Sequence, residues 1–121
     1  MSAATVIRGI GVMRMGFGVL GLAAPGTLAR MFGVDPDLQP GVKFPGRLFG
    51  VRDLVLGIGT LSGGSSGRAF AVAGVASDAG DAVASMLSRR DHEIPERKAQ
   101  MAAASAVASA LIGGFAVLRR R

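Results

Sequence analysis

Long apolar stretches alternate with short polar ones along the chain, and the apolar stretches have the length of helices. The pattern predicts four of them, at residues 6–24, 45–61, 68–88 and 99–118. Pro25 and Gly26 are expected to end the first helix, and a Ser/Gly run at 62–67 to end the second as a short flexible turn. Residues 99–118 carry no charge, and at about 1.5 Å per residue they match the hydrocarbon core of a bilayer.

The longest connection lies between the first two helices and holds four prolines, at positions 25, 36, 40 and 45. Residues 27–32 within it allow two interpretations. One is a short amphipathic helix resting at a membrane interface, and the other is an ordinary polar loop. The shorter connection at 62–67 makes the second and third helices antiparallel neighbours.

Each predicted helix has one face made mostly of small residues, at steps of four, three, four and three positions, which share one side of a helix. These small-residue faces are Ile7, Gly11, Arg14, Gly18 and Gly21; Gly46, Gly50, Asp53, Gly57 and Thr60; Gly74, Asp78, Asp81, Ser85 and Ser88; and Ala102, Ala106, Ser109, Gly113 and Ala116. Small residues let helix backbones approach closely in a bilayer. We therefore expect the four faces to turn toward one another.

Charged residues interrupt the apolar helices and define the candidate site, an intramembrane charge cluster. Its members are Arg14, Arg52, Asp53, Asp78 and Asp81, whose charges sum to minus one. An Arg or Asp at the centre of a membrane span costs about 2.5 to 3.5 kcal/mol on insertion scales, so each needs a partner. We predict that Asp78 or Asp81 faces Arg14 or Arg52.

Composition favours a membrane protein with a single domain over residues 1–121. Half of the residues are hydrophobic, but nineteen are glycine, and Tyr, Trp and Cys are absent. Small side chains bury little apolar area and make a poor water-soluble core. A soluble helical bundle is the alternative, because the two middle helices are individually marginal for membrane insertion. A signal peptide is the alternative for residues 6–24, against which Arg14 in the apolar region argues.

The net charge of +6 is distributed as in membrane proteins. Basic residues lie between or beside the apolar segments, and no aromatic residues alternate with them to stack on bases. The expected partners are therefore the lipid bilayer, further copies of the chain or a larger membrane complex, and not nucleic acid. We expect a multi-pass protein of a bacterial inner or plasma membrane.

Residues for enzymatic chemistry are not grouped in the sequence. Ser77, Asp78 and His92 are the types found in a catalytic triad, but His92 lies in a charged loop, where a lone histidine is usually solvated. One His and no Cys give no metal-ligand spacing. We therefore expect no catalytic, cofactor-binding or metal site, and no enzyme.

The run Gly-Val-Arg-Asp-Leu-Val-Leu-Gly at 50–57, with Pro25 and the Arg-Met-Phe-Gly-Val stretch at 30–34 before it, resembles a family of small bacterial four-helix membrane proteins with no assigned function. The resemblance covers the first half of the chain. It implies a four-span membrane fold and no activity, and Arg52 and Asp53 match the charged pair of the motif.

The fold class expected from these observations is all-α, a four-helix antiparallel transmembrane bundle. We expect a structural, accessory or interaction protein whose buried Arg/Asp pairs fix helix packing. The alternative is a small oligomeric proton-coupled transporter that uses Asp53, Asp78 or Asp81.

Overall fold

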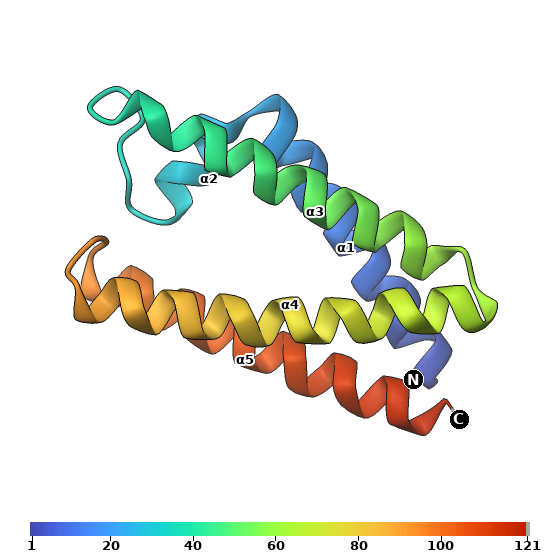
Figure 1. Cartoon of the computed structure of the whole chain (residues 1–121). Coiled ribbons are helices and arrows are strands. Elements are labelled where there is room, and N and C mark those ends of the chain that lie inside the picture. Colours follow the sequence, from blue (N-terminus) through green and yellow to red (C-terminus); the bar gives the residue numbers. More distant parts are fainter. Residues whose placement is uncertain (121) are drawn as a thin grey trace.

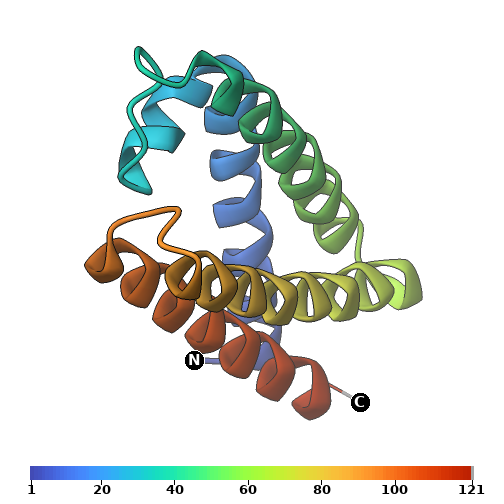
Figure 2. The same ribbon diagram turned by 60° about the vertical axis from the view of Figure 1, so that its left-hand side comes forward.

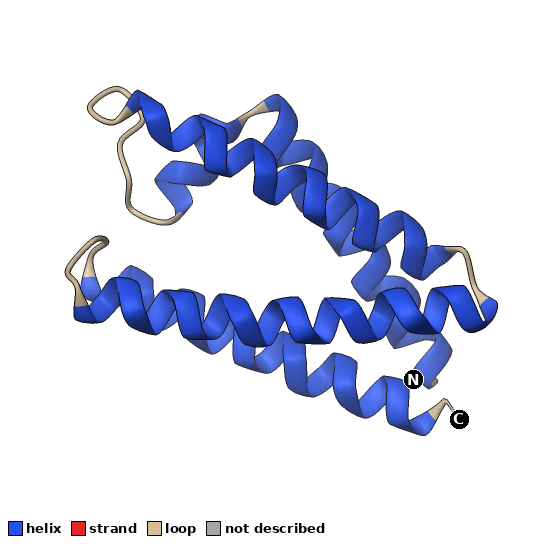
Figure 3. Cartoon of the chain, in the orientation of Figure 1, coloured by secondary structure: helices blue, strands red, loops and turns tan. Residues whose placement is uncertain are grey.

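The computed structural model describes residues 1–120, in which all the regular structure is helical and there is no strand (Figure 3). Its elements are α1 (Ala3–Ala23), α2 (Pro25–Met31), the 3₁₀ helix η1 (Pro40–Val42), α3 (Lys43–Leu61), α4 (Gly64–Arg90) and α5 (Glu96–Arg119). The four long helices correspond to the four predicted ones, each extended by a few residues. The all-helical prediction is therefore confirmed.

Local chemistry explains the helix ends. The Ser2 side chain accepts a hydrogen bond from the Thr5 backbone N–H at 3.2 Å and caps α1. Pro25 separates α1 from α2 and becomes the first residue of α2, a position where its missing N–H costs nothing. For residues 27–32, the helical interpretation is confirmed as far as Met31.

The turn predicted at 62–67 is shorter than expected, because α4 already begins at Gly64. Gly63 and Gly64 have φ angles of 76° and 62°, in the left-handed region that glycine enters without steric cost. These two glycines reverse the chain by themselves, so that Ser65, Ser66 and Gly67 join the helix. The prediction of a six-residue flexible turn is wrong for that reason.

Helices α1 and α3 pack against each other as an antiparallel pair through glycine. A Cβ atom on Gly50 would lie 2.7 Å from the Gly18 carbonyl oxygen, and one on Gly57 would lie 2.7 Å from the Gly11 carbonyl oxygen. Real Cβ atoms do not come so near to backbone atoms. The two helices are therefore in direct backbone contact, which only glycine permits at these positions.

Helices α4 and α5 form the second close pair. Three alanines of α5 are buried, and Ala99 is completely so; the others are Ala103 and Ala116. Near the other end of this pair, the Arg68 guanidinium donates a hydrogen bond of 2.8 Å to the Val117 carbonyl oxygen. This hydrogen bond joins the beginning of α4 to the last turn of α5.

The two pairs meet at one end of the molecule and diverge at the other (Figures 1 and 2). They approach each other where α3 turns into α4, close to both termini, and separate toward α2 and the connection between α4 and α5. At the meeting end, Ile7 of α1 packs with Ala116 and Val117 of α5.

The small-residue faces are buried to different extents. All five predicted residues of α1 are buried, as are four of the five on α3. On α4 and α5 only Gly74, Asp78, Gly113 and Ala116 are buried, and the other members are half-buried. The difference follows from the divergence of the two pairs, which separates the remaining parts of these faces.

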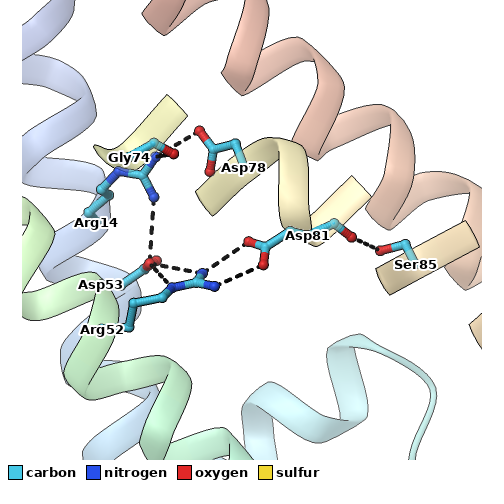
Figure 4. A network of polar contacts seen from close by, with 7 residues as sticks. All are labelled: Arg14, Arg52, Asp53, Gly74, Asp78, Asp81 and Ser85. Atoms are coloured by element: carbon cyan, nitrogen blue, oxygen red, sulfur yellow. Dashed lines mark hydrogen bonds and ion pairs between the residues drawn. The ribbon is translucent and has the colours of Figure 1, made fainter. Parts of the chain in front are cut away.

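The outer surface is rich in large apolar side chains, from Val12 on α1 to Leu118 on α5. Three helices, α1, α4 and α5, are long and apolar enough to cross a membrane. Helix α3 is not one of them. The charges of α3 that lie far from its ends, Arg52 and Asp53, point toward the other helices (Figure 4).

Candidate functional site

Arg14 is at the centre of the charge cluster, and only 4% of its surface is exposed. Its Nη2 donates to Asp78 Oδ2 at 2.7 Å and to the Gly74 carbonyl oxygen at 3.0 Å, both on α4. Its Nη1 lies 3.5 Å from Asp53 Oδ1 on α3 (Figure 4). One guanidinium on α1 therefore binds groups on both α3 and α4.

Arg52 makes the second set of contacts. Its Nη1 and Nη2 donate to the two carboxylate oxygens of Asp81, at 2.8 and 2.9 Å, in the bidentate geometry that suits arginine and carboxylate. Its Nη2 also lies 3.2 Å from Asp53 Oδ1. The guanidinium carbon is 4.7 Å from the centre of the Phe49 ring, which adds a cation–π contact. Arg52 thus ties α3 to α4.

The five charges form a continuous chain in which signs alternate, running Asp78, Arg14, Asp53, Arg52, Asp81. Each carboxylate therefore has a guanidinium as its nearest charged neighbour. Removing charges from water is costly, and it is offset only where each charge has a good partner. Because the cluster contains three carboxylates and two guanidiniums, it carries one negative charge in excess.

Every residue of the predicted cluster lies in this chain. The expected facing of α4 carboxylates and the arginines of the first two predicted helices is also present, with Asp78 paired to Arg14 and Asp81 paired to Arg52. The sequence left the choice between Asp78 and Asp81 open. The structure assigns one to each arginine.

Sequence reasoning missed the Gly74 carbonyl as a partner of Arg14. Gly74 was included only as a small residue, although its size is what opens the carbonyl to the arginine. A Cβ atom at this position would lie 2.9 Å from Arg14 Nη2. The signal available in the sequence was a glycine one helical turn before Asp78, on the same face.

A crevice of about 520 Å³ lies beside the cluster, where the two helix pairs diverge. Its wall includes Arg14, Asp53, Asp78 and Asp81 from the cluster. Bulky apolar residues also line it, from α1, α2 and the residue after it, α3 and the beginning of α5: Met13, Phe17, Met31, Phe32, Phe49 and Met101. Sequence reasoning also missed the crevice, because it is formed by the angle between two helix pairs and no sequence spacing encodes that angle.

Of the residues weighed for other chemistry, Ser77 and Asp78 are neighbours within α4, and His92 follows the end of that helix. Asp78 binds Arg14, and His92 is an exposed residue of the loop after α4, with a φ of 56°. Within residues 1–120, no group of three or more His, Asp or Glu side chains is placed to hold a metal ion. The charge cluster and the crevice are therefore the features around which a function can be argued.

Comparison of the chain with protein-family models, with curated proteins and with solved structures finds no match. The resemblance carried by residues 50–57 stays a prediction that rests on its motif.

Proposed function

We propose that the chain is an integral membrane protein that crosses the bilayer four times, through α1, α3, α4 and α5. The observation that carries this proposal is the inverted distribution of side chains. Arg14, Asp53 and Asp78 are buried among the helices, whereas large apolar side chains cover the outer surface. A protein in water has the opposite arrangement, while a bilayer favours apolar exteriors with paired charges inside.

Helix α3 takes part in this proposal although it is the one long helix that is not by itself a candidate membrane span. Lys43 and Arg47 lie within its first five residues, where long basic side chains reach the membrane surface. The outer face of its remaining length is apolar, with Val51, Val55 and Ile58 each about half exposed. Glycine contact with α1 then allows the two helices to insert as one hairpin.

Four crossings place both termini and the Ser62–Gly63 turn on one side of the bilayer and the other two connections on the opposite side. The positions of the chain ends in Figure 1 agree with this topology. The chain has no cysteine, so single cysteines can be introduced without a background signal. The variants Ser2→Cys and Ser62→Cys are expected to react with a membrane-impermeant maleimide from one side, and Asp37→Cys and His92→Cys from the other.

The membrane location itself is tested by extraction of cell membranes with alkaline carbonate. We expect the full chain to stay in the membrane pellet. Release into the supernatant would contradict the proposal and favour the soluble bundle. Labelling of all four cysteine variants from the same side would contradict the four-span topology while leaving the membrane location intact.

Within the membrane, we propose that the protein is a structural, accessory or interaction protein and not an enzyme. Support comes from the pairing of the cluster, since each of the five charged residues lies within 3.5 Å of an opposite charge in the same cluster. Charges that are paired with one another in this way fix the register of the helices. Mild extraction in a native nanodisc followed by mass measurement is expected to yield a defined complex, either of several copies or with a partner. A monomer under all mild conditions would contradict this role.

Proton-coupled transport is a second candidate, because the crevice reaches the carboxylates of the cluster and one of them is in excess. Vesicles containing the protein and an internal pH-sensitive dye provide the test. Proton flux that disappears in Asp53→Asn would support transport. Vesicles with no flux under any gradient would exclude it and leave the accessory role.

A further inference from the structure

The crevice between the helix pairs has the size of a small-molecule site. Its volume of about 520 Å³ lies within the range of roughly 300 to 1,000 Å³ typical of ligand pockets. It extends from the charge cluster to α2 and the first turns of α5. One end of a ligand in this space would therefore lie beside the charge cluster, and the rest of the ligand would lie beside residues of α2 and α5.

Away from the charge cluster, the lining of the crevice is mostly apolar. Met13, Phe17 and Phe49 belong to the same wall as the cluster, and Met31, Phe32 and Met101 line the part nearer to α2 and α5. Methionine and phenylalanine make favourable dispersion contacts with alkyl groups, and methionine adapts to ligands of different shape. The lining thus suits a ligand with an apolar body.

The cluster leaves carboxylate oxygens unused within the described part of the chain. Both hydrogen-bonding arginines reach Asp53 through Oδ1, and no hydrogen bond to Oδ2 is found. Asp78 likewise receives Arg14 on Oδ2 and has no bond on Oδ1. The Asp53 side chain is only 5% exposed, and its free oxygen is not among the fully buried atoms, so it keeps access to the crevice that Asp53 lines. Carboxylate oxygens that border a crevice and have no partner in the chain favour a ligand that donates hydrogen bonds.

The net charge of the cluster indicates which charge a ligand should carry. The cluster carries one negative charge in excess, and Asp53 is the carboxylate whose contacts with arginine are the longest. Lys98 also lines the crevice, but at its other end, where the Lys98 side chain lies beside Gly33, and it forms no ion pair with the three aspartates. A single positive charge near Asp53 would make the cluster electrically neutral.

We propose that the crevice binds a monovalent organic ammonium ion with an apolar body. Its N–H groups donate to Asp53 Oδ2 and Asp78 Oδ1, and its apolar part lies against the methionine and phenylalanine side chains. This inference rests on the proposal of proton-coupled transport in one respect only: if the protein is a transporter, an organic ammonium ion is the class of its substrate. Binding at equilibrium needs no gradient, so the absence of transport would leave the binding proposal standing.

The test compares three probes with the same chain length and different charge: octylammonium, 1-octanol and octanoate. Each is equilibrated by dialysis with the full chain in nanodiscs of zwitterionic lipid, and empty nanodiscs correct for partitioning into lipid. We expect saturable binding of one octylammonium per chain, at least tenfold tighter than octanol, with octanoate the weakest. Equal binding of octylammonium and octanol by the natural chain would overturn the proposal.

Variants then locate the site. Asp53→Asn leaves two neutral Arg/Asp pairs and removes the excess charge, so it is expected to abolish the preference for octylammonium without changing octanol binding. Asp91→Asn, in an exposed loop outside the crevice, is the matched control and should bind as the natural chain does. Ala102→Leu fills the crevice and is expected to weaken both probes at least fivefold.

Far-UV circular dichroism checks that each variant remains helical. If Asp53→Asn does not fold, the probe series on the natural chain and Ala102→Leu still decide the question. An octylammonium preference that survives in folded Asp53→Asn, or octylammonium binding that Ala102→Leu leaves unchanged, would contradict the assigned site.

Discussion

Arg14 of α1 and Asp78 of α4 form an ion pair of 2.7 Å between two helices that share little other contact. Each helix packs closely on a different neighbour, α1 on α3 and α4 on α5. The ion pair, together with the one between Arg52 and Asp81, therefore joins the two helix pairs about halfway along the helices. Electrostatic contact holds the halves of the molecule together where apolar packing between them is sparse.

Gly74 is expected to be required for this joining. Gly74→Ala places a Cβ atom 2.9 Å from Arg14 Nη2, which forces the guanidinium away from both the Gly74 carbonyl and Asp78. We expect a loss of about 1 to 3 kcal/mol in the free energy of unfolding, the cost of disturbing a buried polar contact. The measurement is unfolding by SDS in mixed micelles, followed by far-UV circular dichroism.

Gly80→Ala is the matched control on the same helix, since a Cβ atom there has nothing within 4 Å. Alanine is the better helix former by up to about 1 kcal/mol, so this variant should be unchanged or more stable. If both variants behave alike, the close contact at Gly74 has no energetic importance.

The contact between α3 and α4 near their shared turn depends on Gly59. A Cβ atom at Gly59 would enter the ring of Phe70, so Gly59→Ala is expected to destabilise the protein by about 1 to 3 kcal/mol through overpacking. Phe70→Ala removes the ring. In the Phe70→Ala background the alanine at position 59 should therefore cost nothing further, and purely additive losses would show that the two residues do not touch.

Thr60 is buried, and its hydroxyl has no hydrogen-bond partner in the part of the chain described. Thr60→Val keeps the shape of the side chain and removes the unpaired group. We expect stability to be unchanged or to rise by about 1 kcal/mol, since an unsatisfied hydroxyl carries a desolvation penalty. A loss of stability in the SDS titration would contradict this, because it would mean that the Thr60 hydroxyl does form a hydrogen bond in the folded protein.

Burial on α1 was predictable from spacing because one of its faces repeats glycine at steps of three and four residues on both sides of a charge. Arg14 follows Gly11 and precedes Gly18 on that face, and all of them are buried. The same reasoning identified Asp53 on α3. In both helices glycine at regular steps is itself the cause of close packing, so the sequence pattern and the structure share one physical origin.

The pairing of Asp78 with Arg14, and of Asp81 with Arg52, was not predictable from spacing. Asp78 and Asp81 are three residues apart on one face, and either could meet either arginine. The choice depends on how far α4 is displaced along α1 and α3. That displacement is set by the tight turn at Gly63 and Gly64, which the sequence pattern made too long.

The crevice was not predictable either, because it depends on the angle between the two helix pairs. Phe17, Phe49 and Met101 come from different helices and show no common spacing in the sequence. Their shared position exists only once the pairs have docked at one end and separated at the other.

The central claim is that specific Arg–Asp pairs join the two helix pairs, and a double-mutant cycle tests it most directly. Arg14→Met and Asp78→Asn are measured singly and together by SDS unfolding, alongside the cycles for Arg52 with Asp81 and for Arg14 with Asp81. We expect coupling of about 1 kcal/mol or more for the two contacting pairs, and a clearly smaller value for Arg14 with Asp81, which do not touch. Additive losses for Arg14 with Asp78, or equal coupling in all three cycles, would contradict the account.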